Sequence, residues 1–238
     1  GDLILDLQEG QEVSPLINEL AKAWAIFGQG QVTEARIAFD KAATSAGMRH
    51  FAIYNKALAL ASVGDFEGAD ALLAQEGNES IQQTRRGTIA HSQILSQLGR
   101  NQDALALLDQ VFGGDYDASV QELVDALASG ERVPYSLVSG PKEGLAELLF
   151  TASSVMAGEA DPTYTILFAR AANALNPNHI EAIMLTGNLF EQMGLFDLAN
   201  DTYALVPQDD PAFVDAELAR ADALQRADRL EAATEVLQ

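Results

Sequence analysis

Hydrophobic residues recur every three or four positions along most of the chain, which is the spacing of one face of an α-helix. The clearest stretch has Phe51, Tyr54 and Leu58, and after Gly64 a second stretch has Ala69 and Leu73. A glycine and charged residues separate the two stretches, as in a tight turn between helices. The pattern predicts two helices joined by a short turn and packed against each other.

The same outline recurs with a period of about 34 residues. Each turn has a glycine, an alanine follows that glycine by five residues, and a large side chain follows the alanine by four. The glycines are Gly30, Gly64, Gly99 and Gly194, the alanines are Ala35, Ala69, Ala104 and Ala199, and the large residues are Phe39, Leu73, Leu108 and Tyr203. A further turn at Asp228 agrees in phase. Small residues let paired helices approach closely, and large ones fill the gap between successive pairs.

This pattern resembles the tetratricopeptide-repeat family, and the chain looks like a fragment of a longer bacterial protein of that family. The resemblance covers most of the chain. It implies an all-α, right-handed α-solenoid of about six helix-turn-helix units. Gly187 matches the close-contact glycine of a first helix. The usual tryptophan and leucine of the first helix are replaced by residues such as Glu19, Ile53 and Thr88.

Residues 113–140 break the period. Glycines and prolines interrupt the segment, and between them Val120, Leu123, Val124 and Leu127 predict one amphipathic helix. We therefore expect N-terminal units over 1–112 (a partial first unit plus three), an irregular insert over 113–140, and C-terminal units over 141–238, the last truncated. A short helix carrying Leu3, Ile4 and Leu7 is expected at the start. Asp161-Pro162 and Asp210-Pro211 each predict a helix start with Asp as N-cap.

The net charge of the chain excludes some classes of binding partner. Thirty-five acidic and fourteen basic residues give a net charge of −21. This argues against sequence-independent nucleic-acid binding, which needs lysine and arginine, and against adsorption to anionic membranes. No apolar run is long enough to span a membrane, so direct membrane insertion is not expected. The absence of cysteine excludes disulfides and cysteine-ligated metal.

Motifs that carry catalysis are missing. The sequence has no phosphate-binding loop and no Gly-x-Ser-x-Gly elbow. His50, His91 and His179 are isolated from one another, and none has a second metal ligand one helical turn away. We expect packing roles for them, no cofactor, no metal and no enzymatic activity.

The resemblance implies that the first helices of successive units line a concave face, where family members bind peptides or protein segments. Carried over by phase, the candidate binding residues are Trp24, Phe27, Phe51, Tyr54, Arg86, Glu147, Glu181, Asn188 and Asp215. The first part of this face is an aromatic wall, and the second is an acidic ladder. Together they suit a partner segment with apolar and basic side chains.

Simpler interpretations stay open for each group. The aromatic residues also suit packing on the preceding helix. The acidic residues lie in first turns, where they interact favourably with the helix dipole. At Arg85 and Arg86 the dipole disfavours positive charge, so ion pairs with acidic neighbours explain them better than a ligand does. The family's clamp for a chaperone's C-terminal carboxylates is not expected, since only Asn188 fits it.

The leading hypothesis is a non-enzymatic scaffold that binds a protein or peptide of basic and apolar character. One alternative is the substrate-recruiting arm of a larger enzyme. Another is a structural module that self-associates into homo-oligomers through its open ends. The sequence does not fix the compartment; an envelope-associated, periplasmic location is slightly favoured over a cytoplasmic one.

Overall fold

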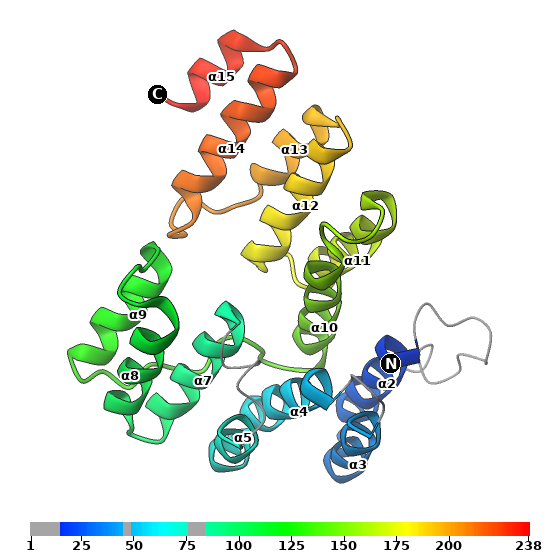
Figure 1. Ribbon diagram of the computed structural model, residues 1–238, viewed down its shortest axis with the longest axis vertical. Helices are drawn as coiled ribbons and strands as arrows, with labels where there is room; N and C mark the ends of the chain where they lie inside the picture. Colours follow the sequence, from blue (N-terminus) through cyan, green and yellow to red (C-terminus); the bar gives the residue numbers. More distant parts are fainter. Residues whose placement is uncertain (1–14, 45–48, 76–83) are drawn as a thin grey trace. The chain divides into compact units, whose positions relative to one another are not determined.

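The computed structural model describes residues 15–44, 49–75 and 84–238, and in these residues it contains thirteen α-helices and no strand (Figure 1). The all-α class is therefore confirmed. The short helix expected around Leu3, Ile4 and Leu7 lies outside the described residues. No helix in the described part of the chain is long and apolar enough to cross a membrane.

The chain forms two compact units, residues 1–145 and 146–238. In the first unit the described helices are α2 (Pro15–Gly28), α3 (Val32–Ala42), α4 (Arg49–Ser62), α5 (Phe66–Leu73), α7 (Arg85–Gln97), α8 (Asn101–Phe112) and α9 (Ala118–Ala128). Helix α10 (Pro141–Met156) begins in the first unit and continues into the second. The second unit then has α11 (Pro162–Leu175), α12 (Ile180–Gln192), α13 (Phe196–Tyr203), α14 (Phe213–Arg226) and α15 (Leu230–Val236).

Consecutive helices pair as hairpins, and successive hairpins stack. The predicted turn glycines Gly30, Gly64, Gly99 and Gly194 all lie at hairpin bends with φ between 71° and 84°. Glycine adopts this left-handed region without a Cβ clash, which explains its recurrence there. Asp228, at the equivalent bend before α15, has φ 60° and is the single non-glycine residue with positive φ in the described chain.

The alternation of small and large residues is confirmed as the packing rule of the stack. The four alanines that follow the bends are fully buried, and so are Phe39, Leu73, Leu108 and Tyr203, to within 3% exposure. Gly187 on α12 is also a close contact, because a Cβ built there would lie 2.3 Å from Cε1 of Tyr203 on α13. The absence of a Cβ at Gly187 therefore lets the tyrosine ring approach the α12 backbone closely.

The predicted helix of the irregular segment is α9, and it packs on α8 as part of the first unit. Val120, Leu123 and Leu127 are buried in one cluster with Leu95 and Leu108. The segment 113–140 thus extends the first array by one helix. The division of the chain into 1–112, 113–140 and 141–238 stays a prediction.

The two Asp-Pro helix starts turn out differently. At Asp161 the side chain accepts a hydrogen bond from the Thr163 N–H (2.8 Å), and α11 begins at Pro162 as predicted. At Asp210 the carboxylate accepts from the Ala212 N–H (2.9 Å), but a turn intervenes and α14 begins only at Phe213. The second start was therefore predicted two residues too early.

Candidate interaction surfaces

An extended segment lies along the side of α7 in the first unit. Residues 131–138, which we call the strap, follow α9 and lead to α10, and Figure 1 shows this connection passing α7. The strap runs antiparallel to α7, because Val133 bonds to Gln97 near the end of the helix and Ser136 bonds to Gln93 one turn earlier. It has no helical or strand structure of its own.

Side chains satisfy the backbone of the strap. Gln97 donates to the Val133 carbonyl (2.5 Å), and Ser96 Oγ accepts from the Val133 N–H (2.9 Å). Gln93 accepts from the Ser136 N–H and donates to its hydroxyl, both at 3.1 Å. Asn101, the first residue of α8, donates to the carbonyl of Glu131 (2.7 Å). We call Gln93, Ser96, Gln97 and Asn101 the polar ladder.

The strap alternates between covered and exposed side chains. Val133, Tyr135 and Leu137 are half-buried, and the residues between them, Pro134 and Ser136, are exposed. Val133 packs against the cluster of α7, α8 and α9, and the Tyr135 ring lies edge-on to Phe66 at 6.3 Å between centroids. The period of two is that of a β-strand pressed on a surface.

After the strap, the first turn of α10 packs on α2. A Cβ on Gly28 would lie 3.2 Å from Pro141, and one on Gly144 would lie 2.4 Å from the ring of Trp24. The strap and this turn therefore pass from the third hairpin back to the first. The α10 turn therefore covers Trp24 on α2, and the strap covers Gln93 on α7.

The predicted aromatic wall is largely an internal cluster. Trp24 is fully buried, makes edge-to-face contacts with Phe27 (5.6 Å) and Phe39 (5.5 Å), and donates its indole N–H to the Asn55 side chain at 2.7 Å. Phe27 is also buried, so the assignment of Trp24 and Phe27 to an exposed binding surface was wrong. Their large apolar rings join α2, α3 and α4 instead.

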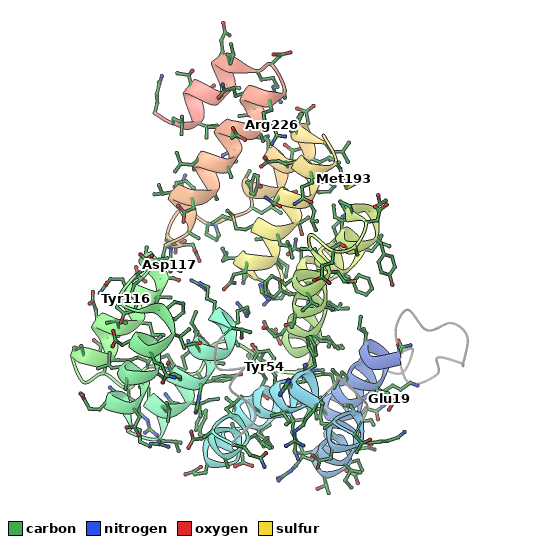
Figure 2. The ribbon with its side chains drawn as sticks, viewed as in Figure 1. Glu19, Tyr54, Tyr116, Asp117, Met193 and Arg226 are labelled. Atoms are coloured by element: carbon green, nitrogen blue, oxygen red, sulfur yellow. The ribbon has the colours of Figure 1, made fainter. Side chains whose placement is uncertain are left out.

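The other two aromatic candidates lie on α4. Tyr54 is buried and Phe51 is half-buried; Figure 2 labels Tyr54 on this helix. Tyr54 was therefore also wrong as an exposed anchor, for the same reason. Of the aromatic candidates, only Phe51 keeps a substantial part of its surface accessible.

The predicted acidic ladder loses its first member to the core of the second unit. Glu147 is 1% exposed, and its carboxylate lies 3.1 Å from Nε2 of His179. The other ring nitrogen, Nδ1, accepts from the Ala182 N–H (3.3 Å) and so caps α12, which places the ring proton on Nε2, facing Glu147. Glu147 is a buried partner of a helix cap, and its assignment to the groove was wrong.

The remaining members keep some access to solvent. Glu181 is partly exposed and lies 3.6 Å from His179 Nδ1. Asn188 is exposed and accepts a hydrogen bond from Gln192 (2.7 Å), and Asp215 is exposed in the first turn of α14. Val214 and Leu218 lie beside Asp215 on the same face of α14 and are 66% and 54% exposed.

A network of charged side chains joins the C-terminal ends of α12 and α14. Arg226, labelled in Figure 2, pairs with Glu191 (2.8 Å), stacks over Phe196 at 4.5 Å, and lies 3.8 Å from Asp222. Glu191 also accepts from the Tyr203 hydroxyl (2.8 Å). Burial and the Glu191 carboxylate raise the pKa of Tyr203 above its ordinary value. The network fixes the α12–α14 contact and leaves Asp222 mostly exposed.

The two arginines at the start of α7 also have structural partners. Arg85 makes a bidentate pair with Asp117 (2.9–3.0 Å), the N-cap of α9; Figure 2 labels Asp117 on that helix. The ion-pair interpretation is confirmed for Arg85. Arg86 is half-buried, and its role as a binding residue stays a prediction.

The described residues contain no group of three or more His, Asp or Glu side chains placed to hold a metal ion. His91 is buried, and its Nε2 lies 2.7 Å from Asp70, which also pairs with Arg100 at 2.7 Å. Burial lowers the pKa of His91, although the Asp70 carboxylate opposes this. This triad joins α5, α7 and the bend before α8.

One position of the repeat, in the first helix of each hairpin at a fixed distance before the bend, differs in exposure between the two units. It is occupied by Trp24, Leu58 and Gln93 in the first unit and by Asn188 and Asp222 in the second. The first three are buried and the last two are exposed. The strap was missed in the sequence, although the apolar alternation Val133, Tyr135, Leu137 and the spacing of Gln93, Ser96 and Gln97 were visible in it.

The bends, the repeat spacing and the stacked hairpins define a tetratricopeptide-like helical-repeat protein. Comparison with known protein-family models and with curated proteins gives no match. Among solved structures, a crystal structure of MamA protein has 17% identity and a TM-score of 0.37, covering 79% of this chain and 86% of that chain. Acl4, the assembly chaperone of RpL4 (residues 1–338), has 14% identity and a TM-score of 0.32, covering 94% of this chain and 88% of its own. Likeness at this level carries no information on function.

Proposed function

We propose that this chain is a non-enzymatic interaction scaffold that binds a protein or peptide segment on the first helices of its second unit. The observation that carries the proposal is the repeat position at Asn188 and Asp222, which is exposed here and buried in the first unit. In the first unit the α10 turn covers Trp24, and the strap covers Gln93. The corresponding face of α12 and α14 is left available to a partner.

The chemistry of this face suggests the kind of segment. On α14, Asp215, Leu218 and Asp222 follow one another at helical spacing, with Val214 beside them, and all four are exposed. We call these four residues the acidic–apolar stripe. Acidic side chains around exposed leucine and valine complement apolar residues flanked by lysine or arginine. The net charge of −21 would also attract a basic partner over distance.

A peptide array tests the proposal with defined probes. Fifteen-residue peptides with leucine or phenylalanine next to lysine or arginine are expected to bind, and their matched glutamate versions are not. Asp215→Asn with Asp222→Asn should weaken binding at least fivefold at low salt. Glu231→Gln with Glu235→Gln removes the same charge from exposed positions of α15 and should change binding little. Binding that is indifferent to salt and to both pairs of substitutions would exclude this surface.

The alternatives of self-association into homo-oligomers and of a substrate-recruiting arm of a larger enzyme stay predictions. The slight preference for a periplasmic location stays a prediction.

A further inference from the structure

The polar ladder recognises backbone rather than a particular sequence. All four of its members bond to peptide N–H or C=O groups of the strap, at Val133, Ser136 and Glu131. These contacts would be available to any chain in the same extended conformation. An extended segment that is not paired with another strand normally leaves its backbone N–H and C=O groups to water. Here the side chains of α7 and Asn101 make the hydrogen bonds that a neighbouring strand would make.

Specificity in this contact comes from alternate side chains. Val133 and Tyr135 have defined apolar surroundings, at the α7–α9 cluster and at Phe66. Leu137 continues the alternation, and Val138 is fully buried at the end of the strap. The outward residues between them are Pro134 and Ser136, which are exposed, and the Ser136 hydroxyl accepts a hydrogen bond from Gln93 (3.1 Å).

We propose that the polar ladder and these apolar positions form a binding site for an extended polypeptide. The strap fills this site within the chain, and a partner segment with the same alternation fills it in its place. The fitting partner has β-branched, aromatic or leucine side chains at every second position and small or polar residues between them. It needs no net charge, since backbone bonds and apolar contacts dominate, and the site is independent of the acidic–apolar stripe on α14.

The strap competes with such a partner at high effective concentration, because it is tethered at both ends. Short tethers give effective concentrations of the order of millimolar. A partner therefore binds tightly only when the strap is weakened, and added segments displace it only in excess. This gives the proposal a measurable consequence: weakening the strap must uncover binding in trans.

The test uses a labelled synthetic peptide of residues 129–140 and fluorescence anisotropy. Val133→Ser, Tyr135→Ser and Leu137→Ser together release the strap without changing its length. This variant is expected to bind the peptide at least tenfold more tightly than the natural chain does. Adding Gln93→Ala and Gln97→Ala should weaken the binding again about tenfold, since several backbone bonds are lost. A control peptide exchanges the inward residues with Arg132, Pro134 and Ser136 and should not bind.

Folding is checked by circular dichroism and by the emission of the single tryptophan, which is buried in α2. A folded triple variant that binds the peptide no better than the natural chain overturns the proposal, and so does binding that survives loss of the two glutamines.

If the triple variant does not fold, limited trypsin digestion of the natural chain decides the question. Cleavage after Arg132 requires the strap to leave α7, since the next N–H is bonded to Ser96. Excess peptide carrying Arg132→Gln is expected to speed this cleavage at least fivefold, and the control peptide is not. An unchanged rate would overturn the proposal. Asp215→Asn with Asp222→Asn should have no effect, which separates this site from the proposed function.

Discussion

Gly187 on α12 offers the sharpest test of how the hairpins pack. Replacing it with alanine puts a methyl group 2.3–2.7 Å from three ring atoms of Tyr203. Carbon atoms in contact normally lie about 3.5–4.0 Å apart, so the ring must move by more than about 1 Å. The ring is 3% exposed and is tied through its hydroxyl to Glu191, so it has little room to move.

Two opposing effects set the size of the change. In a helix interior, alanine is favoured over glycine by about 1 kcal/mol. Overpacking costs about 1–3 kcal/mol, and losing a hydrogen bond to a charged group costs about 1.5–3 kcal/mol. We therefore expect Gly187→Ala to lower the local free energy of unfolding by about 2–4 kcal/mol, although it improves helix propensity.

Native-state hydrogen exchange of α12 and α13 is the suitable assay, because stacked repeats open in parts and the single tryptophan lies in the first unit. In a Tyr203→Ala background the clash is absent, and Gly187→Ala should become stabilising by up to about 1 kcal/mol. In a Tyr203→Phe background the ring remains, so the substitution should stay destabilising. If Gly187→Ala protects α12 more strongly in the natural chain, the close contact is not what the glycine serves.

Three further predictions concern a bend, a buried imidazole and a helix cap. Asp228→Gly should raise the local free energy of unfolding of α15 by roughly 0.5–1 kcal/mol, because glycine tolerates the positive φ. Hydrogen exchange in α15 should then be slower, and faster exchange would contradict the prediction. Burial lowers the pKa of His91 in the folded chain despite Asp70, so below about pH 6.5 the unfolded chain takes up the proton first and the free energy of unfolding decreases. In urea denaturation, the loss of stability as the pH is lowered should therefore be less steep for His91→Gln than for the natural chain. Equal slopes would exclude His91 as a cause of the pH dependence. Asp117→Ala should lower the local free energy of unfolding of α9, measured by hydrogen exchange, by about 1 kcal/mol because the N-cap is lost. Asp117→Asn keeps the cap and loses the exposed ion pair with Arg85, so it should lower this free energy less. Equal losses for the two variants would assign the effect to the ion pair.

The sequence predicted the hairpins because their determinants are local. A glycine at a bend, an alanine five residues later and a large residue four beyond that all act within one hairpin or between neighbours. The same reasoning identified α9 from its own stripe. It placed the start of α14 too early, because the Asp210 cap bond forms as expected but closes a turn before the helix begins.

The candidate surface was harder to predict because exposure depends on segments distant in the sequence. Trp24 was expected to line a groove, and Gly144 from α10 lies against its ring. Glu147 was expected in the same groove, and His179 shields it. The position of a residue within the repeat predicts to which side of the helix its side chain points. It does not predict which other segment of the chain packs on that side. Of the predicted acidic residues, Asp215 on α14 is exposed and Glu181 on α12 is partly exposed.

The residue types at the shared repeat position agree with this division of roles. The first unit has Trp24, Leu58 and Gln93 there, and each is buried, the glutamine by bonding to the strap. The second unit has Asn188 and Asp222, which are stable in water without a covering segment. An exposed tryptophan or leucine at those positions would add to an apolar patch, and a buried aspartate would need a partner charge. This division is consistent with the two proposed recognition surfaces, one for apolar extended backbone in the first unit and one for basic side chains on α14.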